Sequence, residues 1–268
     1  MFIMQNFTIG FIGGGALAEA LVKGIAGKLV PSENIYVSDH KEARCAELEK
    51  NYGIHASVGA RDFLPAADLL LLAVKPKDAK AAMEEIAPRV REDAVIISVV
   101  AGLTLSSVEE HFRQQPVFRV MPNVPQAVGA GMAAYASGSR TTEKAAEQVK
   151  LLWDAVGRSI EVDEHLMDAV TGLSGSGPAY AFLMIDALAD GGVAAGLPRK
   201  TAILLAAQTL FGAAKMVLET ERHPDVLRDQ VTSPGGTTIA GVRALEKAGL
   251  RSALIEAVLA AAERSREL

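Results

Sequence analysis

The chain has 268 residues, half of them hydrophobic and few aromatic, and its formal net charge is −5. This composition is typical of a soluble protein with a large core, and the negative charge gives no general attraction to nucleic acid or to a membrane surface. The single cysteine, Cys45, excludes an internal disulfide, and the five histidines lack metal-ligand spacing, so we expect no metal site.

The first predicted strand, residues 7–12, ends at Ile12 and leads into a glycine-rich turn and a helix that runs to Ala26. The turn reads Gly13-Gly14-Gly15-Ala16-Leu17-Ala18, which fits the G-x-G-x-x-A dinucleotide-binding pattern between a strand and a helix. In this pattern the second glycine lets a pyrophosphate approach the backbone. A glycine-rich turn without a ligand is the alternative, and the position of the turn favours cofactor binding.

The next predicted strand, residues 34–38, ends in polar residues that bear on the choice of cofactor. An acidic residue such as Asp39 usually accepts hydrogen bonds from the adenine ribose of NAD. The neighbouring Ser38, His40, Lys41 and Arg44 could instead hold the 2′-phosphate of NADP, or the basic residues could form a solvent-exposed helix face. The residues alone therefore leave NADH and NADPH open.

Five further strands are predicted at residues 68–74, 94–100, 117–121, 132–136 and 159–162, with a helix at 142–156. Three of these strands end in turn or small residues, at Lys75-Pro76, Ala101-Gly102 and Pro122-Asn123, which leaves room for a cofactor along their edge. Lys75 lies where ligands bind in such sheets. The alternation of strand and helix up to residue 163 predicts an α/β, doubly wound, Rossmann-like domain.

After residue 163 the pattern predicts helices alone, at residues 165–173, 178–195, 198–219, 225–231, 237–247 and 251–267. Residues 195–218 are apolar around most of the helix circumference, which is typical of a buried helix. A helical part of this size has little core of its own, so we expect a homodimer; a compact monomeric bundle is the alternative. We therefore divide the chain into domains at residues 1–163 and 164–268.

Two apolar segments bear on the location of the protein. The start of the chain lacks the basic region of a signal peptide. The run at residues 202–218 is interrupted by Gln208 and Lys215 and is expected to be too short to span a bilayer comfortably. We expect a cytoplasmic protein that is not attached to a membrane.

An uncharged loop near the end of the chain, Val231-Thr-Ser-Pro-Gly-Gly-Thr-Thr-Ile239, carries four hydroxyl groups. Gly235 to Thr238 read as a tight turn that opens a helix, where free backbone N–H groups can bind a small anion. The alternative is an ordinary helix start capped by Thr237 or Thr238.

Five motifs together resemble the pyrroline-5-carboxylate reductase family, in the right order and across essentially the whole chain. They are Gly13-Gly-Gly-Ala-Leu-Ala18, Ala73-Val-Lys-Pro76, Met121-Pro-Asn123, Leu173-Ser-Gly-Ser-Gly-Pro-Ala-Tyr180 and Thr232-Ser-Pro-Gly-Gly-Thr-Thr238. The last of them, with the tail that follows it, is the most specific. The resemblance implies NAD(P)H-dependent reduction of 1-pyrroline-5-carboxylate to L-proline, the final step of proline biosynthesis. It also implies an all-α dimerisation domain after the nucleotide-binding domain, and dimers that assemble into larger rings such as a decamer.

The resemblance also assigns residues. It implies cofactor contacts from Ile12, Gly13, Gly14, Gly15, Ala16, Leu17, Ser38, Asp39, Ala73, Val74, Lys75, Pro76, Val100, Ala101, Gly102 and Asn123. It implies substrate contacts from Val231, Gly235, Gly236, Thr237 and Thr238, with Thr238 at the ring nitrogen and with Ser233 and Glu221 as further catalytic residues. NADP is the implied cofactor, whereas Asp39 and Ala60 depart from some NADPH users and leave NADH possible.

Two other functions are weighed. The first is a β-hydroxyacid dehydrogenase or a related imine reductase of the same two-domain plan. Alcohol oxidation needs a proton acceptor, and the hydroxyacid enzymes carry a lysine and an asparagine where this chain has Ala181 and Met184. The second is a non-catalytic redox sensor, which would bind cofactor without turning over a cyclic imine.

Overall fold

A computed structural model describes residues 6–59 and 62–267; Ala60 lies outside this range. The chain forms two compact units, one made of the residues up to Gly175 and from Ala261 onward, the other of Ser176–Ala260. Met167, which follows the last strand, is buried in the core of the first unit. The unit boundary therefore falls after residue 163, and the functional division proposed there stays a prediction.

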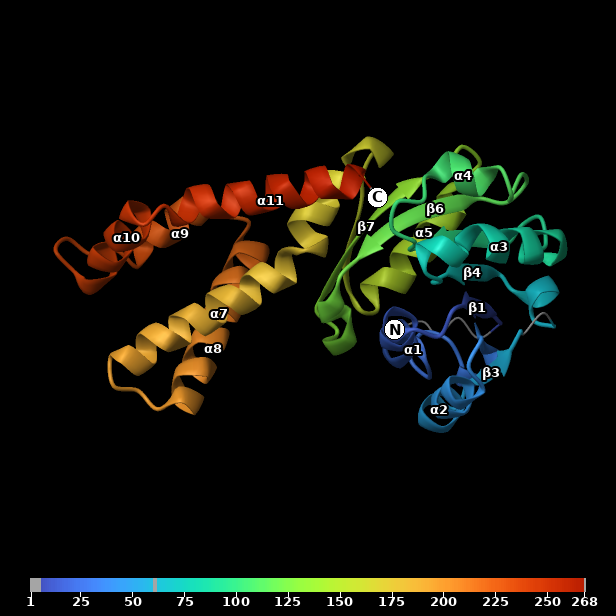
Figure 1. Ribbon diagram of the computed structural model, residues 1–268, viewed down its shortest axis with the longest axis horizontal. Coiled ribbons are helices and arrows are strands. Elements are labelled where there is room, and N and C mark those ends of the chain that lie inside the picture. Colours follow the sequence, from blue (N-terminus) through green and yellow to red (C-terminus); the bar gives the residue numbers. More distant parts are fainter. Residues whose placement is uncertain (1–5, 60–61, 268) are drawn as a thin grey trace. The chain divides into compact units, whose positions relative to one another are not determined.

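The first unit is built on an eight-stranded sheet with the order β3-β2-β1-β4-β5-β6-β7-β8 (Figure 1). The strands are β1 (Ile9–Ile12), β2 (Ile35–Asp39), β3 (His55–Val58), β4 (Leu69–Leu72), β5 (Val95–Ser98), β6 (Val117–Pro122), β7 (Gly131–Ser137) and β8 (Gly157–Glu161). Strands β1 to β6 are parallel, whereas β7 runs antiparallel to β6 and parallel to β8. The chain runs outward from β1 to β3 and then returns to β4 on the other side of β1. The order thus reverses at β1, where doubly wound sheets bind ligands.

Helices cover both faces of the sheet. They are α1 (Ala16–Ile25), α2 (Glu42–Tyr52), α3 (Pro76–Ile86), α4 (Leu105–Glu109), α5 (Glu143–Asp154) and α6 (Met167–Val170). Helices α1, α2 and α5 pack on one face in a core that includes Phe11 and Trp153, and α3 and α4 pack on the other around Leu70 and Met83. Strands β4 and β5 are fully buried, as expected for parallel strands covered on both faces. The predicted α/β doubly wound fold is confirmed.

Short helical turns complete this unit: η1 (Ser32–Asn34), η2 (Leu64–Ala66), η3 (Ala87–Arg89), η4 (Val124–Val128), η5 (Glu164–Leu166) and the π-helical turn η6 (Thr171–Gly175). Residues 165–173, predicted as one regular helix, are thus divided among η5, α6 and η6. The hydroxyls of Thr171 and Ser174 donate to the carbonyl oxygens of Met167 and Val170, at 2.8 and 3.1 Å. Such bonds compete with the regular helical ladder.

The apolar pattern does not predict β3. Its four residues, His-Ala-Ser-Val, lie at the edge of the sheet and only Ala56 is buried. An edge strand needs no continuous apolar run, so hydrophobic periodicity gives little signal there.

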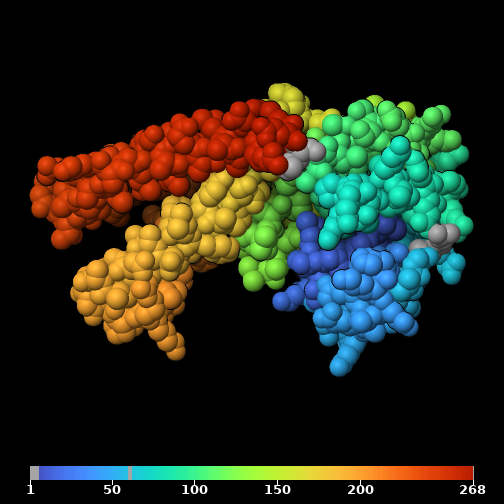
Figure 2. Space-filling model, viewed as in Figure 1, coloured from blue at the N-terminus to red at the C-terminus, as the bar shows by residue number. Residues whose placement is uncertain are grey.

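The second unit contains α7 (Gly177–Ala194), α8 (Arg199–Thr220), α9 (Pro224–Gln230), α10 (Thr237–Lys247) and most of α11 (Leu250–Arg266). Helices α7 and α8 pack through small residues, and Ala189, Ala202 and Ala206 are buried between them. The hydroxyl of Tyr180 on α7 donates to the carbonyl oxygen of Ala257 on α11 at 3.2 Å. Figure 2 shows α7 with α8 and α9 to α11 as two arms with open space between them.

Most large apolar side chains of this unit are exposed in the single chain. Helix α8 has 22 residues and is, by length and composition alone, long and apolar enough to cross a membrane. Only 11% of its most apolar 18-residue stretch is buried. The expectation that this apolar run is too short to span a bilayer is therefore wrong. A helix apolar on nearly all sides requires another apolar surface to cover it.

Candidate active site

The glycine turn between β1 and α1 is fixed by its backbone. Gly13 has a φ of +104°, and a Cβ added there would lie 2.5 Å from the carbonyl oxygen of Ala73. The N–H of Gly13 donates to the carbonyl oxygen of Ser38 at 2.7 Å. Gly15 is the N-cap of α1, and a Cβ added there would meet nothing within 4 Å. The start of α1 therefore presents backbone N–H groups to open space, as a pyrophosphate site requires.

A cavity of about 920 Å³ lies at the carboxyl ends of β1, β2 and β4. Nine predicted cofactor residues line it: Ile12, Gly13, Gly14, Gly15, Ser38, Asp39, Ala73, Val74 and Lys75. The basic residues His40, Lys41 and Arg44 line it too, together with Val58, Gly59, Lys77, Asp78, Ala82, Glu85 and Ile86, which no motif identified. The volume is at the upper end of the range for small-molecule sites, which fits an extended dinucleotide. Val58 ends β3 and Gly59 follows it, so recognising that strand would have found them.

The uncharged loop in the second unit begins α10. Gly235 has a φ of +67°, and Gly236 is the N-cap without a side-chain hydrogen bond to the helix. The alternative of a cap from Thr237 or Thr238 is therefore wrong, because both residues already belong to the first turn. Their side chains are exposed, and the first N–H groups of α10 have no side-chain cap, which suits an anionic group.

Ser233 and Gly236 are brought together within this loop. The Gly236 N–H donates to the Ser233 carbonyl oxygen at 3.1 Å, and a Cβ added at Gly236 would lie 2.3 Å from the Ser233 hydroxyl oxygen. Val231 closes the end of α9 and is exposed. Glu221 follows α8 with a φ of +53°, the single positive φ outside glycine among residues 6–59 and 62–267. A non-glycine residue held in this region costs energy and is often found at functional sites.

Comparison with known proteins assigns the chain to a family. The family model for pyrroline-5-carboxylate reductase dimerisation matches residues 164–268, and that for coenzyme F420-dependent NADP oxidoreductase matches residues 8–102. A pyrroline-5-carboxylate reductase of Synechocystis sp. is 48% identical over 265 residues, which are 98% of this chain and 99% of that protein. The chain belongs to the pyrroline-5-carboxylate reductase family.

Solved reductase structures have the same fold. The structure from Coxiella burnetii has a TM-score of 0.90 at 34% identity and covers 98% of each chain. That of the Plasmodium falciparum pyrroline carboxylate reductase, solved with NADP bound, has a TM-score of 0.87 at 32% identity, again over 98% of each chain. The match to the dimerisation family explains the exposed apolar surface of the helical unit, and the expectation of a homo-oligomer that acts on a small molecule is confirmed.

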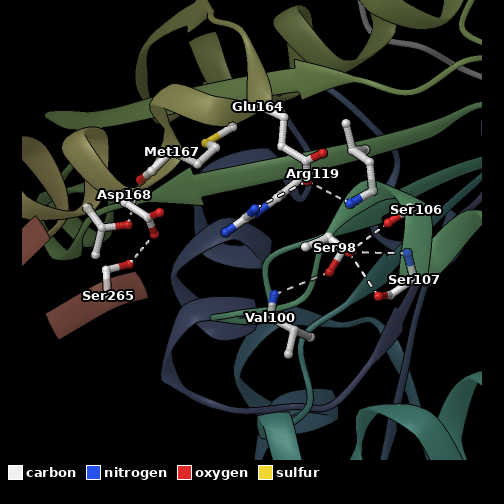
Figure 3. Close-up of polar contacts among 12 residues, drawn as sticks. Ser98, Val100, Ser106, Ser107, Arg119, Glu164, Met167, Asp168 and Ser265 are labelled. Carbon is white, nitrogen blue, oxygen red and sulfur yellow. Dashed lines mark hydrogen bonds and ion pairs between the residues drawn. The ribbon is translucent and has the colours of Figure 1, made fainter. Parts of the chain in front are cut away.

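Seven residues assigned to the cofactor by the family resemblance do not line the cavity among the residues that the structure describes: Ala16, Leu17, Pro76, Val100, Ala101, Gly102 and Asn123. The first three open α1 and α3. Val100 is buried, and its N–H donates to the Ser98 hydroxyl at 3.4 Å (Figure 3). Asn123 accepts from the Met132 N–H at 2.8 Å and donates to the Ser174 carbonyl oxygen at 3.0 Å. Asn123 thus ties the end of β6 to β7 and to η6.

A second polar network fixes the segment after β8 to the sheet (Figure 3). Arg119 on β6 is buried and donates to Glu164 at 3.2 Å, and the same carboxylate oxygen accepts from the Leu105 N–H at 2.7 Å. On α6, Asp168 accepts from the Ser265 hydroxyl at 2.7 Å. These contacts hold the start of α4 and the end of α11 to the residues that follow β8.

Side chains from β2 and α2 are tied to the glycine turn. The Asp39 carboxylate accepts from the N–H groups of Gly14 at 2.9 Å and Lys41 at 3.0 Å. Arg44 donates through Nε to the Gly14 carbonyl oxygen at 2.7 Å and through Nη2 to Glu19 at 2.6 Å. Asp39 is the residue expected at the adenine ribose, and Arg44 is one of those that could hold a 2′-phosphate; both side chains bond the backbone of the turn.

A pH effect follows from the Glu19 contact. The hydrogen bond from Arg44 holds the pKa of Glu19 below its usual value of 4.5. A lowered pKa contributes stability above pH 4.5 that is lost as the pH falls through the folded-state pKa. We expect Glu19→Gln to lower the free energy of unfolding by about 1 kcal/mol near neutral pH, and the difference from wild type to narrow below pH 4.5. Urea unfolding across this range measures it, and Glu147→Gln on the exposed side of α5 is the control; a difference that widens in acid would contradict the assignment.

Proposed function

We propose that the protein reduces 1-pyrroline-5-carboxylate to L-proline, the last step of proline biosynthesis, with NADPH. The observation that carries this proposal is the start of α10, where free N–H groups and two exposed threonine hydroxyls lie in a loop without charge. A cyclic imine acid needs these two features, a cradle for its carboxylate and a hydrogen-bond partner for its nitrogen. Bound NADPH supplies the hydride for the imine carbon.

The chain's own residues then bind and orient the substrate. The first turn of α10 and Gly235 and Gly236 hold the carboxylate, and the Thr238 hydroxyl hydrogen-bonds the ring nitrogen, with Ser233 beside it. A hydroxyl is a weak acid, so Thr238 orients the nitrogen while its proton comes from water or Glu221. Imine reduction needs no strong base, in agreement with α7, whose sequence contains no lysine or histidine.

In this proposal the cofactor lies in the cavity of the first unit, with Gly13, Gly14 and Gly15 around its pyrophosphate. The relative solved with NADP bound supports NADPH, and the carboxylate of Asp39 already accepts two backbone N–H groups, which leaves it fewer acceptor sites for ribose hydroxyls. We further propose that dimers assemble into larger rings such as a decamer. The apolar surface of α8 is then covered by a partner subunit, and the protein is cytoplasmic and not attached to a membrane.

Turnover assays separate this function from its alternatives. Purified protein is mixed with pyrroline-5-carboxylate and either NADPH or NADH, and the loss of nicotinamide absorbance is followed. We expect turnover with the imine, faster with NADPH. Oxidation of β-hydroxyacids with no imine reduction would favour the dehydrogenase, and cofactor binding without any turnover would favour a redox sensor.

Thr238→Ala tests the substrate loop. Loss of a hydrogen bond to a group that becomes charged is expected to lower kcat/KM by roughly 10- to 100-fold. Thr238→Ser keeps the hydroxyl and is the matched control, expected to stay within about threefold of wild type. An alanine variant with full activity would remove the role assigned to this side chain.

A further inference from the structure

Gly14, the middle glycine of the cofactor turn, is held on both sides by side chains. Its N–H donates to Asp39 on β2, and its carbonyl oxygen accepts from Nε of Arg44 on α2, at 2.9 and 2.7 Å. Asp39 and Arg44 come from a different strand and helix than the turn itself. The conformation of the turn is therefore set by the element that follows β2 as well as by its own glycines.

The contact with the carbonyl oxygen has a directional consequence. In a trans peptide the C=O of one residue and the N–H of the next point in opposite directions, and no peptide bond among the described residues is cis. Arg44 holds the carbonyl of Gly14, so the N–H of Gly15 points away from Arg44. Gly15 lines the cavity, is exposed and has open space at its Cβ position. Arg44 thus fixes the direction of the N–H that opens α1.

Arg44 is also committed electrostatically. Its guanidinium donates to Glu19 at 2.6 Å and to Glu47 at 2.7 Å, in addition to Gly14, and its side chain is 20% exposed. Glu19 is held in turn by the Tyr52 hydroxyl at 2.9 Å. The hydrogen bond with Glu19 raises the pKa of Arg44 above its usual value. Two carboxylates therefore balance the charge of this arginine, whereas His40 and Lys41 at the same cavity are exposed.

We propose that Arg44, held by Glu19, is a positioning residue that fixes the pyrophosphate turn for either cofactor and is not the ligand of the 2′-phosphate of NADPH. The inference rests on the proposed function in one respect alone, which is that the protein binds a nicotinamide dinucleotide. A ligand of the 2′-phosphate would affect NADPH alone. A positioning residue acts on the pyrophosphate, which NADH and NADPH share, so its loss weakens both equally.

Direct binding of NADH and NADPH to the intact protein, followed by quenching of protein fluorescence, tests the inference without turnover. For Arg44→Gln we expect both Kd values to rise by about tenfold with their ratio unchanged within about twofold. Arg44→Lys is expected to be no better, because the single nitrogen of a lysine cannot take the separate positions from which Nε, Nη1 and Nη2 bond Gly14, Glu47 and Glu19. If Arg44 were instead a ligand of the 2′-phosphate, Arg44→Lys would keep most of the affinity for NADPH. Arg113→Gln, an exposed arginine that donates to the Glu110 carbonyl outside the cavity, is the control.

For Glu19→Gln the two possible roles of Arg44 predict changes of opposite sign in the Kd of NADPH. This test applies even if the Arg44 variants fold poorly. Without its partner Arg44 holds the turn less firmly, so we expect both Kd values to rise by about threefold. If Arg44 were a phosphate ligand, removing the competing carboxylate would tighten NADPH and leave NADH unchanged. That result, or unchanged Kd values in every variant, would overturn the inference. Wild-type protein that binds neither cofactor would overturn the proposed function as well. Wild-type protein that binds both cofactors, with variants that change the Kd of NADPH alone, would overturn this inference alone.

Discussion

Replacing Leu204 and Phe211 on α8 with glutamate is expected to convert the homo-oligomer into monomers. These side chains are 67% and 58% exposed in the single chain. They are seven residues apart and lie on one face of the helix, while the buried Ala202 and Ala206 lie on the opposite face against α7. The face that α7 does not cover is thus apolar, and a partner subunit is the surface that the dimerisation family provides for it.

The expected effect is large because a symmetric interface counts each substitution twice. Burial of two large apolar side chains in each of two subunits, at roughly 1.5 kcal/mol each, contributes about 6 kcal/mol. This corresponds to about four orders of magnitude in the dimer Kd, and burying glutamate costs more. Size-exclusion chromatography with light scattering measures the mass. Leu151→Glu, an apolar residue exposed on α5 outside the helical unit, is the control, and a double variant that keeps its wild-type mass would contradict the assignment.

The sequence predicts the central architecture well because the central strands carry a simple signal. Strand β4 reads Leu69-Leu-Leu-Leu72 and is buried throughout. In a chain that alternates strands and helices, a short continuous apolar run of this kind is typical of a buried parallel strand. The edge strand β3 and the turns of residues 164–175 escape prediction. The turns are formed by side-chain hydrogen bonds to the backbone, and β3 is formed by its pairing with β2. Neither interaction produces a periodic apolar pattern in the sequence.

The candidate site shows a similar division. The glycine turn and the end of β4 could be placed at the cavity from the motifs because their chemistry is carried by the backbone. The partners of Asp39 and Arg44 could not, since a carboxylate or a guanidinium can serve a ligand or a loop, and only contacts across 25 to 30 residues of sequence show which. Asn123 is a further case, where a residue assigned to the cofactor has both ends of its amide bonded to backbone.

Gly13→Ala is expected to abolish cofactor binding and to destabilise the protein. At a φ of +104° any side chain is strained, and the new Cβ would lie 2.5 and 2.8 Å from the carbonyl oxygen and carbon of Ala73. These are backbone atoms at the end of β4, so no rotamer change relieves the contact and the turn must move. We expect a loss of roughly 2 to 4 kcal/mol in the free energy of unfolding, and a rise of more than about 100-fold in the Kd of NADPH, because a misplaced turn no longer directs its N–H groups at the pyrophosphate.

Variants at two other glycines separate the effect of backbone strain from that of the close approach of the pyrophosphate to the backbone. Gly15→Ala adds a Cβ into open space, so stability should stay near wild type while the methyl group blocks the backbone from the pyrophosphate and binding is lost. Gly53→Ala at the end of α2 has a φ of +64° with nothing near its Cβ, so it should lose about 1 kcal/mol of stability and keep cofactor affinity. Urea unfolding and fluorescence titration on all three variants measure both quantities. If Gly15→Ala bound NADPH as tightly as wild type, the pyrophosphate would not lie at this turn, and the placement of the cofactor in this cavity would have to be abandoned.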